Sequence, residues 1–228
     1  MTALLVSVTS AAEAAAAVEA GAKVIDAKDP TAGALGALPP DTVRAIVAAV
    51  AGRVPVSAAA GDAPDVDAAA ALADTGADYV KVPVGRGEAG AAALSAFGAA
   101  LGARTKLVAV FAADREPDLD LVDTAAAAGF AGVMLDTVEK GAGLLDATDL
   151  AEVARFVAAG HRNKLLVGLA GSLRVVDVGT LLPLQPDLVG FRGGVCVDGD
   201  RRKALDPARV RAVATAIAVH AARRLAGA

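Results

Sequence analysis

The sequence predicts one (β/α)₈ barrel, the TIM-barrel fold of the α/β class, with residues 1–228 forming a single domain. Its 228 residues approach the roughly 250 that are typical of such barrels. Short apolar segments alternate eight times with alanine-rich segments of helical length. Glycines recur where a helix is expected to give way to a strand, at 20–23, 75–78 and 128–131, and glycine accepts the left-handed conformation that ends helices.

The expected strands are the apolar segments Leu4–Val8, Lys23–Asp26, Val54–Ala58, Tyr79–Val82, Leu107–Phe111, Val133–Asp136, Leu165–Leu169 and Leu188–Phe191. The expected helices are Ala11–Ala20, Asp41–Ala51, Val66–Asp74, Ala89–Leu101, Leu119–Ala128, Leu150–Ala159, Leu173–Leu182 and Pro207–Ala226. Strands that alternate with helices run parallel, and eight such units favour a closed barrel over an open doubly wound sheet. No Gly-x-Gly-x-x-Gly motif follows the first strand, which argues against a dinucleotide-binding fold.

The composition disfavours several classes of protein. Hydrophobic residues make up 55% of the chain, but no apolar run reaches the roughly 18–20 residues that span a bilayer. Residues 1–4 lack the basic region of a signal peptide and are expected to lead into the first strand of a cytoplasmic protein. The net charge of −4 gives no reason to expect nucleic-acid or membrane binding.

The few cysteine and histidine residues limit the chemistry further. A single cysteine, Cys196, excludes an internal disulfide and is typical of a reducing compartment. Together with His161 and His220 it cannot form a His/Cys zinc cluster, so no metal is expected. A Ser-His-Asp triad is disfavoured because His161 is expected in a polar turn and His220 in the last helix.

Charged residues at the carboxyl ends of three strands are the catalytic candidates, since barrel active sites lie at that end. Strand alternation places Asp26 and Lys28 on one side of the second strand. Lys81 interrupts the apolar fourth strand, where a lysine is costly unless it is paired or used. The sixth strand ends at Asp136, and Lys140 follows four residues later.

The choice of lysine at these positions indicates amine chemistry. The chain has 15 arginines and only seven lysines, and lysine, unlike arginine, can lose its proton when it is buried or lies beside another cation. Each Asp–Lys pair also has a structural interpretation, a salt bridge at the barrel mouth, but three such strand ends favour a functional one. The lysines expected at strand starts, Lys23, Lys106 and Lys164, are interpreted as solvated surface charges.

The last two strands end in a pattern that is typical of phosphate binding. Gly171 and Ser172 follow the seventh strand, and Arg192, Gly193 and Gly194 follow the eighth. Glycines let backbone N–H groups approach an anion, and barrel phosphate sites commonly use these two loops. The alternative is a pair of glycine turns without a ligand. The glycine-bearing loop 29–36 is expected either to cover the substrate or to be only an irregular connection.

Several segments together resemble the (5-formylfuran-3-yl)methyl phosphate synthases of methanofuran biosynthesis. The resemblance follows one order along nearly the whole chain, through residues 24–30, 33–36, 76–82, 133–137, 169–173 and 189–196. It implies an enzyme that joins two molecules of glyceraldehyde 3-phosphate, with loss of phosphate and water and without metal or redox cofactor.

The resemblance also implies roles for individual residues. Lys28 corresponds to a Schiff-base lysine and Lys81 to a proton acceptor, while Asp26, Asp136 and Lys140 correspond to supporting groups. Residues 112–117 are shorter than the family pattern, so no role is carried over there.

Two other functions stay open at this point. One is another lysine-dependent aldolase of small sugar phosphates, and the other is a non-catalytic barrel that binds a phosphorylated metabolite. The alanine-rich helices permit close packing of subunits, so a homo-oligomer is also open.

Overall fold

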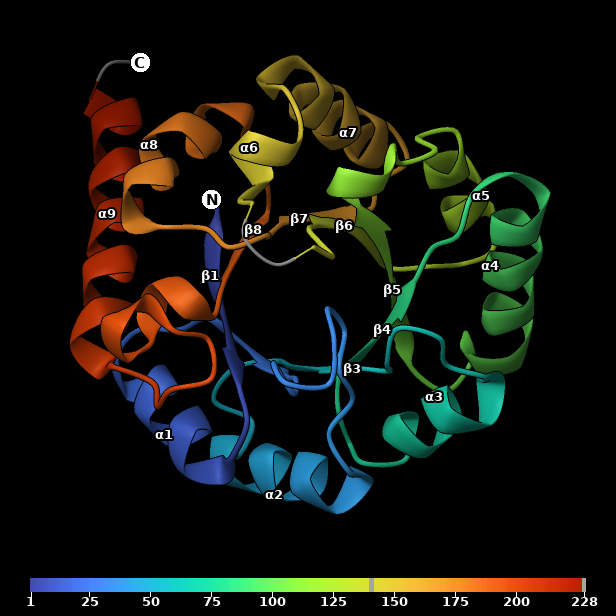
Figure 1. Cartoon of the computed structure of the whole chain (residues 1–228), viewed down its shortest axis with the longest axis horizontal. Coiled ribbons are helices and arrows are strands. Elements are labelled where there is room, and N and C mark those ends of the chain that lie inside the picture. The colour runs from blue at the N-terminus through green and yellow to red at the C-terminus, as the bar shows by residue number, and fades with distance from the viewer. Residues whose placement is uncertain (140–141, 227–228) are drawn as a thin grey trace.

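The computed structural model describes residues 1–139 and 142–226, apart from the side chains of 224 and 225, and these residues form a closed parallel barrel. The eight strands follow one another around the barrel in sequence order, and β8 (Leu188–Phe191) pairs with β1 (Ala3–Val8) to close it. Helices surround the ring of strands, and the last helix, α9 (Pro207–Ala226), lies between its neighbours α8 and α1 (Figure 1). The predicted single-domain TIM barrel is confirmed.

The remaining strands are β2 (Val24–Ala27), β3 (Val56–Ala59), β4 (Tyr79–Pro83), β5 (Lys106–Ala112), β6 (Gly132–Asp136) and β7 (Leu166–Leu169). The helices that follow the first six strands are α1 (Ala11–Glu19), α2 (Pro40–Val50), α3 (Val66–Ala73), α4 (Gly87–Leu101), α5 (Leu121–Ala127) and the pair α6 (Leu144–Ala147) and α7 (Leu150–Arg162). Every strand lies within two residues of its predicted bounds, because buried parallel strands are continuous apolar segments.

One expected helix was wrong in extent. The segment predicted as a helix over 173–182 instead contains the 3₁₀ turn η2 (Val175–Asp177), a four-residue α8 (Val178–Leu181) and the 3₁₀ turn η3 (Leu182–Leu184). Arg174 is extended, and its backbone N–H donates to the Asp177 carboxylate at 2.7 Å, so helical structure begins only after it. The short helix α6 was not predicted.

Two apolar layers hold the barrel together. One lies between the strands and the surrounding helices, and the other fills the barrel interior with Leu5, Val24, Val108, Met134 and Leu188 among its buried members. Interior glycines leave room for the long methionine: a Cβ on Gly168 would lie only 2.9 Å from Met134 Cε.

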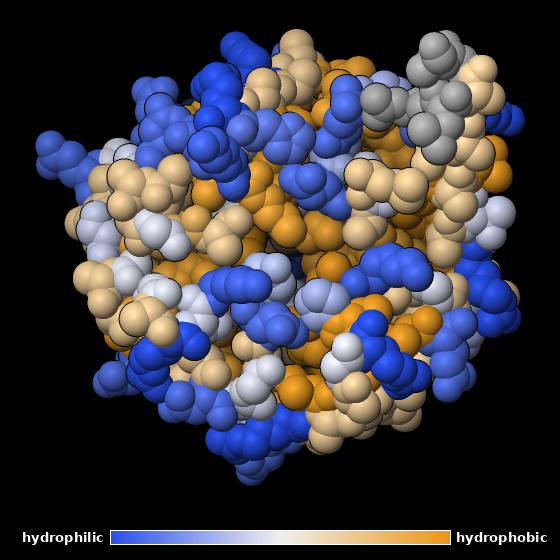
Figure 2. Space-filling model, turned by 180° about the vertical axis from the view of Figure 1, so that it is seen from behind, coloured by the Kyte–Doolittle hydropathy of each residue, from blue (hydrophilic) through white to orange (hydrophobic). Residues whose placement is uncertain are grey.

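The face at the strand starts carries no candidate site residue. Lys23, Lys106 and Lys164 are exposed there, as expected, and Lys106 Nζ lies 5.3 Å from the ring centroid of Tyr79. Figure 2 shows the side opposite to that in Figure 1, where hydrophilic and hydrophobic residues are mixed. Over the described ranges, the chain has no helix that combines the length and the apolar character needed to cross a membrane.

Candidate active site

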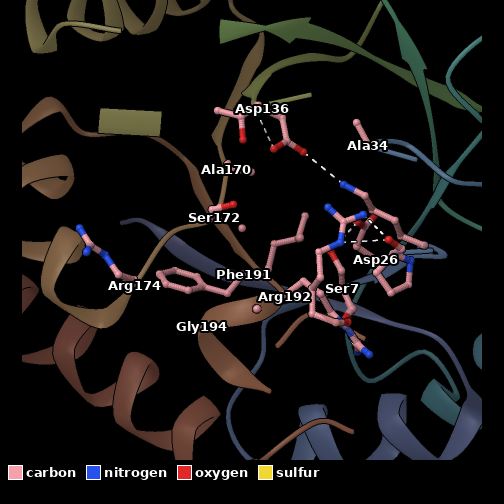
Figure 3. A pocket seen from close by; sticks show the side chains of 18 of the residues that line it. Ser7, Asp26, Ala34, Asp136, Ala170, Ser172, Arg174, Phe191, Arg192 and Gly194 are labelled. Carbon is pink, nitrogen blue, oxygen red and sulfur yellow. Dashed lines mark hydrogen bonds and ion pairs between the residues drawn. The ribbon is translucent and has the colours of Figure 1, made fainter. Parts of the chain in front are cut away.

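A cavity of about 500 Å³ opens at the carboxyl ends of the strands. Side chains from the ends of β1, β2, β4, β6, β7 and β8 line it, so residues far apart in the sequence meet there (Figure 3). The structure brings four predicted catalytic residues to this cavity: Asp26, Lys28, Lys81 and Asp136. Lys140 lies outside the described residues.

A row of three polar side chains crosses β1, β2 and β3. Strand register pairs Ser7 with Asp26 and Asp26 with Ser57, so all three side chains point into the barrel. The two hydroxyls hold the carboxylate from both sides: Ser7 Oγ donates to Asp26 Oδ2 at 2.9 Å, and Ser57 Oγ donates to Oδ1 at 2.7 Å. Asp26 is completely buried, and these bonds offset the cost of burying its charge.

Lys81 forms a buried ion pair with this carboxylate. Its Nζ lies 2.7 Å from Asp26 Oδ1, and its side chain is only 3% exposed. Burial is the largest influence and lowers the pKa of Lys81; Asp26 opposes that effect, and the positive charge of Lys28 adds to it. Burial alone would raise the pKa of Asp26, but the two lysines and the hydrogen bonds hold it below its ordinary value. The surroundings therefore make the proton of Lys81 easier to lose and keep Asp26 easier to ionise.

A second, apolar cavity of about 100 Å³ lies beneath Lys81 in the barrel interior. Leu5, Val24, Val108 and Leu188 are among the side chains that form its wall. Such a wall offers few hydrogen-bond partners to water. The lysine therefore has polar partners on the side of the large cavity and an apolar environment on the other side.

Lys28 lies nearer the opening than Lys81. Its Nζ donates to Asp136 Oδ2 at 3.2 Å, the contact drawn as a dashed line in Figure 3, and both side chains are slightly exposed, at 14% and 13%. The other oxygen of Asp136 accepts the backbone N–H of Thr137 at 2.8 Å, which fixes the carboxylate at the end of β6. Lys28 is thus an amine that a substrate can reach, held beside a carboxylate.

The predicted phosphate loops provide four backbone N–H groups at the cavity wall. Those of Gly171, Ser172, Gly193 and Gly194 donate to no protein acceptor within residues 1–139 and 142–226. Gly171 has a φ of +110°, and a Cβ on Gly194 would lie 2.4 Å from the Leu173 carbonyl oxygen, so both positions require glycine. We call these four groups the N–H cradle.

Arg192, the predicted cation of this region, donates its hydrogen bonds to acceptors within the protein. Its Nη1 donates to Glu13 at 2.6 Å and to the Ser7 carbonyl oxygen at 3.1 Å, and its Nη2 donates to Glu13 at 3.3 Å and to the Lys203 carbonyl oxygen at 3.1 Å. Its Nε donates to the Arg201 carbonyl oxygen at 2.9 Å. Arg192 lies in the cavity wall, but its donors hold the protein together, so the structure argues against the predicted direct contact with an anion.

Sequence reasoning missed four residues of this region. Ser7 and Ser57 had a readable signal, because each lies in a predicted strand next to the one that carries Asp26. No signal in the sequence indicates Glu13 or Arg201, because their hydrogen-bond partners are more than 150 positions away along the chain. Among the described residues, no three His, Cys, Asp or Glu side chains are grouped to hold a metal ion.

A closed parallel barrel with a lysine- and aspartate-lined cavity at the carboxyl ends of its strands has the architecture of a (β/α)₈-barrel enzyme. Residues 4–214 match the model of the 4-HFC-P synthase family. The chain belongs to that family.

Relatives that carry the synthase name extend over almost the whole chain. The (5-formylfuran-3-yl)methyl phosphate synthase of Methanopyrus kandleri is 38% identical and covers 94% of this chain and 98% of its own length. The synthase of that name from Archaeoglobus fulgidus is 36% identical over 87% of this chain and 92% of its own. A relative from Methylorubrum extorquens is 48% identical over 91% of this chain and 88% of its own. The predicted family and the prediction of an enzyme are confirmed.

Solved structures share the fold at low sequence identity. Phosphoribosyl anthranilate isomerase from Thermus thermophilus gives a TM-score of 0.71 at 17% identity, covering 96% of this chain and 100% of its own. The 3-hexulose-6-phosphate synthase from Salmonella typhimurium gives 0.69 at 19% identity, with the same coverage. These similarities establish the barrel fold alone and do not indicate which reaction the site catalyses.

Proposed function

We propose that this chain condenses two molecules of glyceraldehyde 3-phosphate into (5-formylfuran-3-yl)methyl phosphate, with loss of phosphate and water, in methanofuran-type cofactor biosynthesis. The observation that carries the proposal is the placement of two lysines of different character at one cavity. Lys28 is reachable and lies beside Asp136, whereas Lys81 is buried beside Asp26. The names of the relatives support the product.

Lys28 would form the covalent bond to the substrate. Its unprotonated amine attacks the aldehyde carbon, and loss of water gives an imine whose protonated form withdraws electrons from the neighbouring carbon. Asp136, 3.2 Å from Nζ, would orient the amine and accept or return protons as water leaves.

Lys81 would then act as the base. Burial lowers the pKa of its amine, so the neutral form needed to remove the proton next to the iminium carbon is easier to reach than for an exposed lysine. The resulting enamine supplies the carbon nucleophile that joins the second aldehyde. Asp26, with both oxygens already accepting hydrogen bonds, would hold Lys81 in position.

The N–H cradle would hold the phosphate of one substrate. Its four backbone donors need no side-chain movement to meet an anion, and two of them, from Gly193 and Gly194, begin the 3₁₀ turn η4 (Gly193–Val195). Fixing the phosphate there would place the aldehyde end toward Lys28 across the cavity and raise its effective concentration.

Incubation with glyceraldehyde 3-phosphate alone tests the proposal. We expect a product that absorbs in the near ultraviolet with the mass of the furan phosphate. An open-chain product would instead indicate another lysine-dependent aldolase. An unchanged substrate would favour the alternative of a barrel that binds a phosphorylated metabolite without catalysis.

Borohydride trapping tests the covalent step. Reduction in the presence of substrate should leave one adduct on the wild type and none on Lys28→Ala. Lys23→Ala is the matched control, because Lys23 is exposed at the start of β2, whereas Lys28 follows its end. This variant should leave trapping unchanged. An equal adduct on the Lys28 variant would refute the imine.

A further inference from the structure

Arg201 joins the loop after Lys28 to the opposite side of the cavity. Its Nε donates to the Pro30 carbonyl oxygen at 3.0 Å, and its Nη2 donates to the carbonyl oxygens of Pro30 and Gly33, the latter at 2.8 Å. Arginine suits this task because one planar edge can meet two acceptors. A side chain from the connection after β8 therefore fixes the loop after β2, 171 positions earlier in the sequence.

The same residue lies against the N–H cradle. A Cβ placed on Gly193 would be 3.8 Å from Arg201 Cβ, and the Arg201 carbonyl oxygen accepts the Arg192 Nε. Arg201 lines the large cavity, and its remaining nitrogen, Nη1, donates to no acceptor in the part of the chain that the structure describes. A residue that adjoins Gly193 thus keeps one free cationic donor in the wall of the same cavity as the four free backbone donors.

The loop that Arg201 holds forms part of the cavity wall. Pro30 and Ala34 line the cavity, and Lys28 precedes this loop directly. The far end of the loop is fixed separately, since the Asp62 carboxylate accepts the backbone N–H groups of Ala34 at 3.2 Å and Leu35 at 2.7 Å. Loss of Arg201 would therefore release only the half of the loop nearer to Lys28.

Two other arginines at the cavity, Arg192 and Arg174, do not meet these conditions. The three types of guanidinium nitrogen of Arg192 all donate to protein acceptors. Arg174 forms a bidentate contact with Asp177, and its guanidinium points away from the other labelled side chains in Figure 3.

We propose that Arg201 is a phosphate-binding residue whose Nη1 contacts the anion in the N–H cradle while its Nε and Nη2 hold residues 30–33 over the cavity. The proposal rests on the proposed function and deepens it by supplying the cation of the phosphate site. Binding of the phosphate and closure of the loop that follows Lys28 then depend on the same guanidinium. A phosphorylated aldehyde would use the Nη1 contact, which an aldehyde without phosphate cannot make.

The first experiment measures binding of inorganic phosphate by calorimetry to the full chain. A charge-assisted hydrogen bond supports about a ten- to hundredfold loss of affinity in Arg201→Met. The matched control is Arg202→Met, because Arg202 is the exposed neighbour that pairs with Asp200. Equal affinity in wild type and Arg201→Met would overturn the proposal.

The second experiment follows amide hydrogen exchange of residues 30–36. Phosphate should slow exchange there in wild type and Arg202→Met but not in Arg201→Met. Arg201→Lys, which can meet fewer acceptors, should recover part of the phosphate affinity and little of the loop protection. Phosphate-dependent protection that persists without Arg201 would contradict the link between anion and loop.

Trapping with borohydride separates this proposal from the overall function. Wild type should trap glyceraldehyde 3-phosphate faster than glyceraldehyde, and Arg201→Met should show a much smaller preference. If no furan product forms but phosphate binding still depends on Arg201, the proposed reaction fails and this inference stands. If product forms and Arg201→Met keeps the full preference for the phosphorylated aldehyde, the inference fails and the reaction stands.

Discussion

Lys81 Nζ lies 2.7 Å from Asp26 Oδ1, and the strand between β4 and β2 contributes Ser57 to the same carboxylate oxygen. The pair is buried, so neither charge has water to stabilise it if the other is removed. The relationship links the chemistry of the site to the stability of the barrel, because the same ion pair serves both.

Replacement of Lys81 by methionine should destabilise the fold. It leaves the Asp26 carboxylate buried without its cation, and breaking a buried pair in this way costs about 3–5 kcal/mol. Chemical denaturation measures the loss. Adding Asp26→Asn should restore a large part of it, since the carboxamide carries no charge, whereas a double variant less stable than Lys81→Met would contradict this account.

The buried lysine should also make stability depend on alkaline pH. Its pKa in the folded chain is lowered from 10.5, so between the lowered value and 10.5 the unfolded chain binds more protons than the folded one. The contribution of Lys81 to the free energy of unfolding therefore rises with pH through that window. Urea unfolding at several pH values should show a steeper rise in wild type than in the Lys81→Met, Asp26→Asn double variant. Parallel curves would argue against a lowered pKa.

Lys81→Arg separates the ion pair from the base. Arginine keeps the positive charge but does not lose its proton at ordinary pH, so turnover should fall by about 10²–10⁴ while the imine at Lys28 still forms. Product formation and borohydride trapping are measured on the same preparation. Near-normal turnover would remove Lys81 as the proton acceptor.

Arg192 and Glu13 should act as one unit. Their ion pair, 2.6 Å long and largely buried, joins α1 to the end of β8, and the Arg192 hydrogen bonds lower the pKa of Glu13 against the effect of its burial. Arg192→Met and Glu13→Gln should each reduce the free energy of unfolding by about 1.5–3 kcal/mol. The double variant should lose little more than either single variant. Additive losses would show that the two residues act independently. Weakened phosphate binding in Arg192→Met alone would indicate that the arginine contacts the ligand.

Gly194→Ala should damage the N–H cradle. The new Cβ would lie 2.4 Å from the Leu173 carbonyl oxygen, so the backbone must shift, at a cost of about 1–3 kcal/mol and with weaker phosphate binding. Gly179→Ala is the control, because nothing lies within 4 Å of its added Cβ and alanine favours the helix by about 0.5–1 kcal/mol. Calorimetry with phosphate distinguishes the two variants, and equal binding by both would exclude a role for the loop.

The strands and the inward side of β2 could be predicted because both depend on local pattern. A buried parallel strand is a continuous apolar segment, and alternation alone places Asp26 and Lys28 on one side. The extent of the helix near 173–182 depended instead on a cap, the Asp177 carboxylate on the Arg174 N–H, which overrides helix propensity.

The position of a charged side chain was predictable, but its partner was not. Arg192 was correctly placed at the end of β8, yet its acceptors come from Glu13 and from three carbonyl oxygens that only folding brings near. For Arg201 even the position could not be predicted, because it does not directly follow an expected strand end. Only tertiary structure brings it to the cavity.

The small apolar cavity beneath Lys81 has a mechanical consequence. Apolar side chains line most of its volume of about 100 Å³, and unfolding removes this loosely filled space, so the total volume of protein and solvent should fall on unfolding. High hydrostatic pressure should therefore shift the equilibrium toward the unfolded chain. The space that gives one amine an apolar environment should therefore also make the folded chain sensitive to pressure.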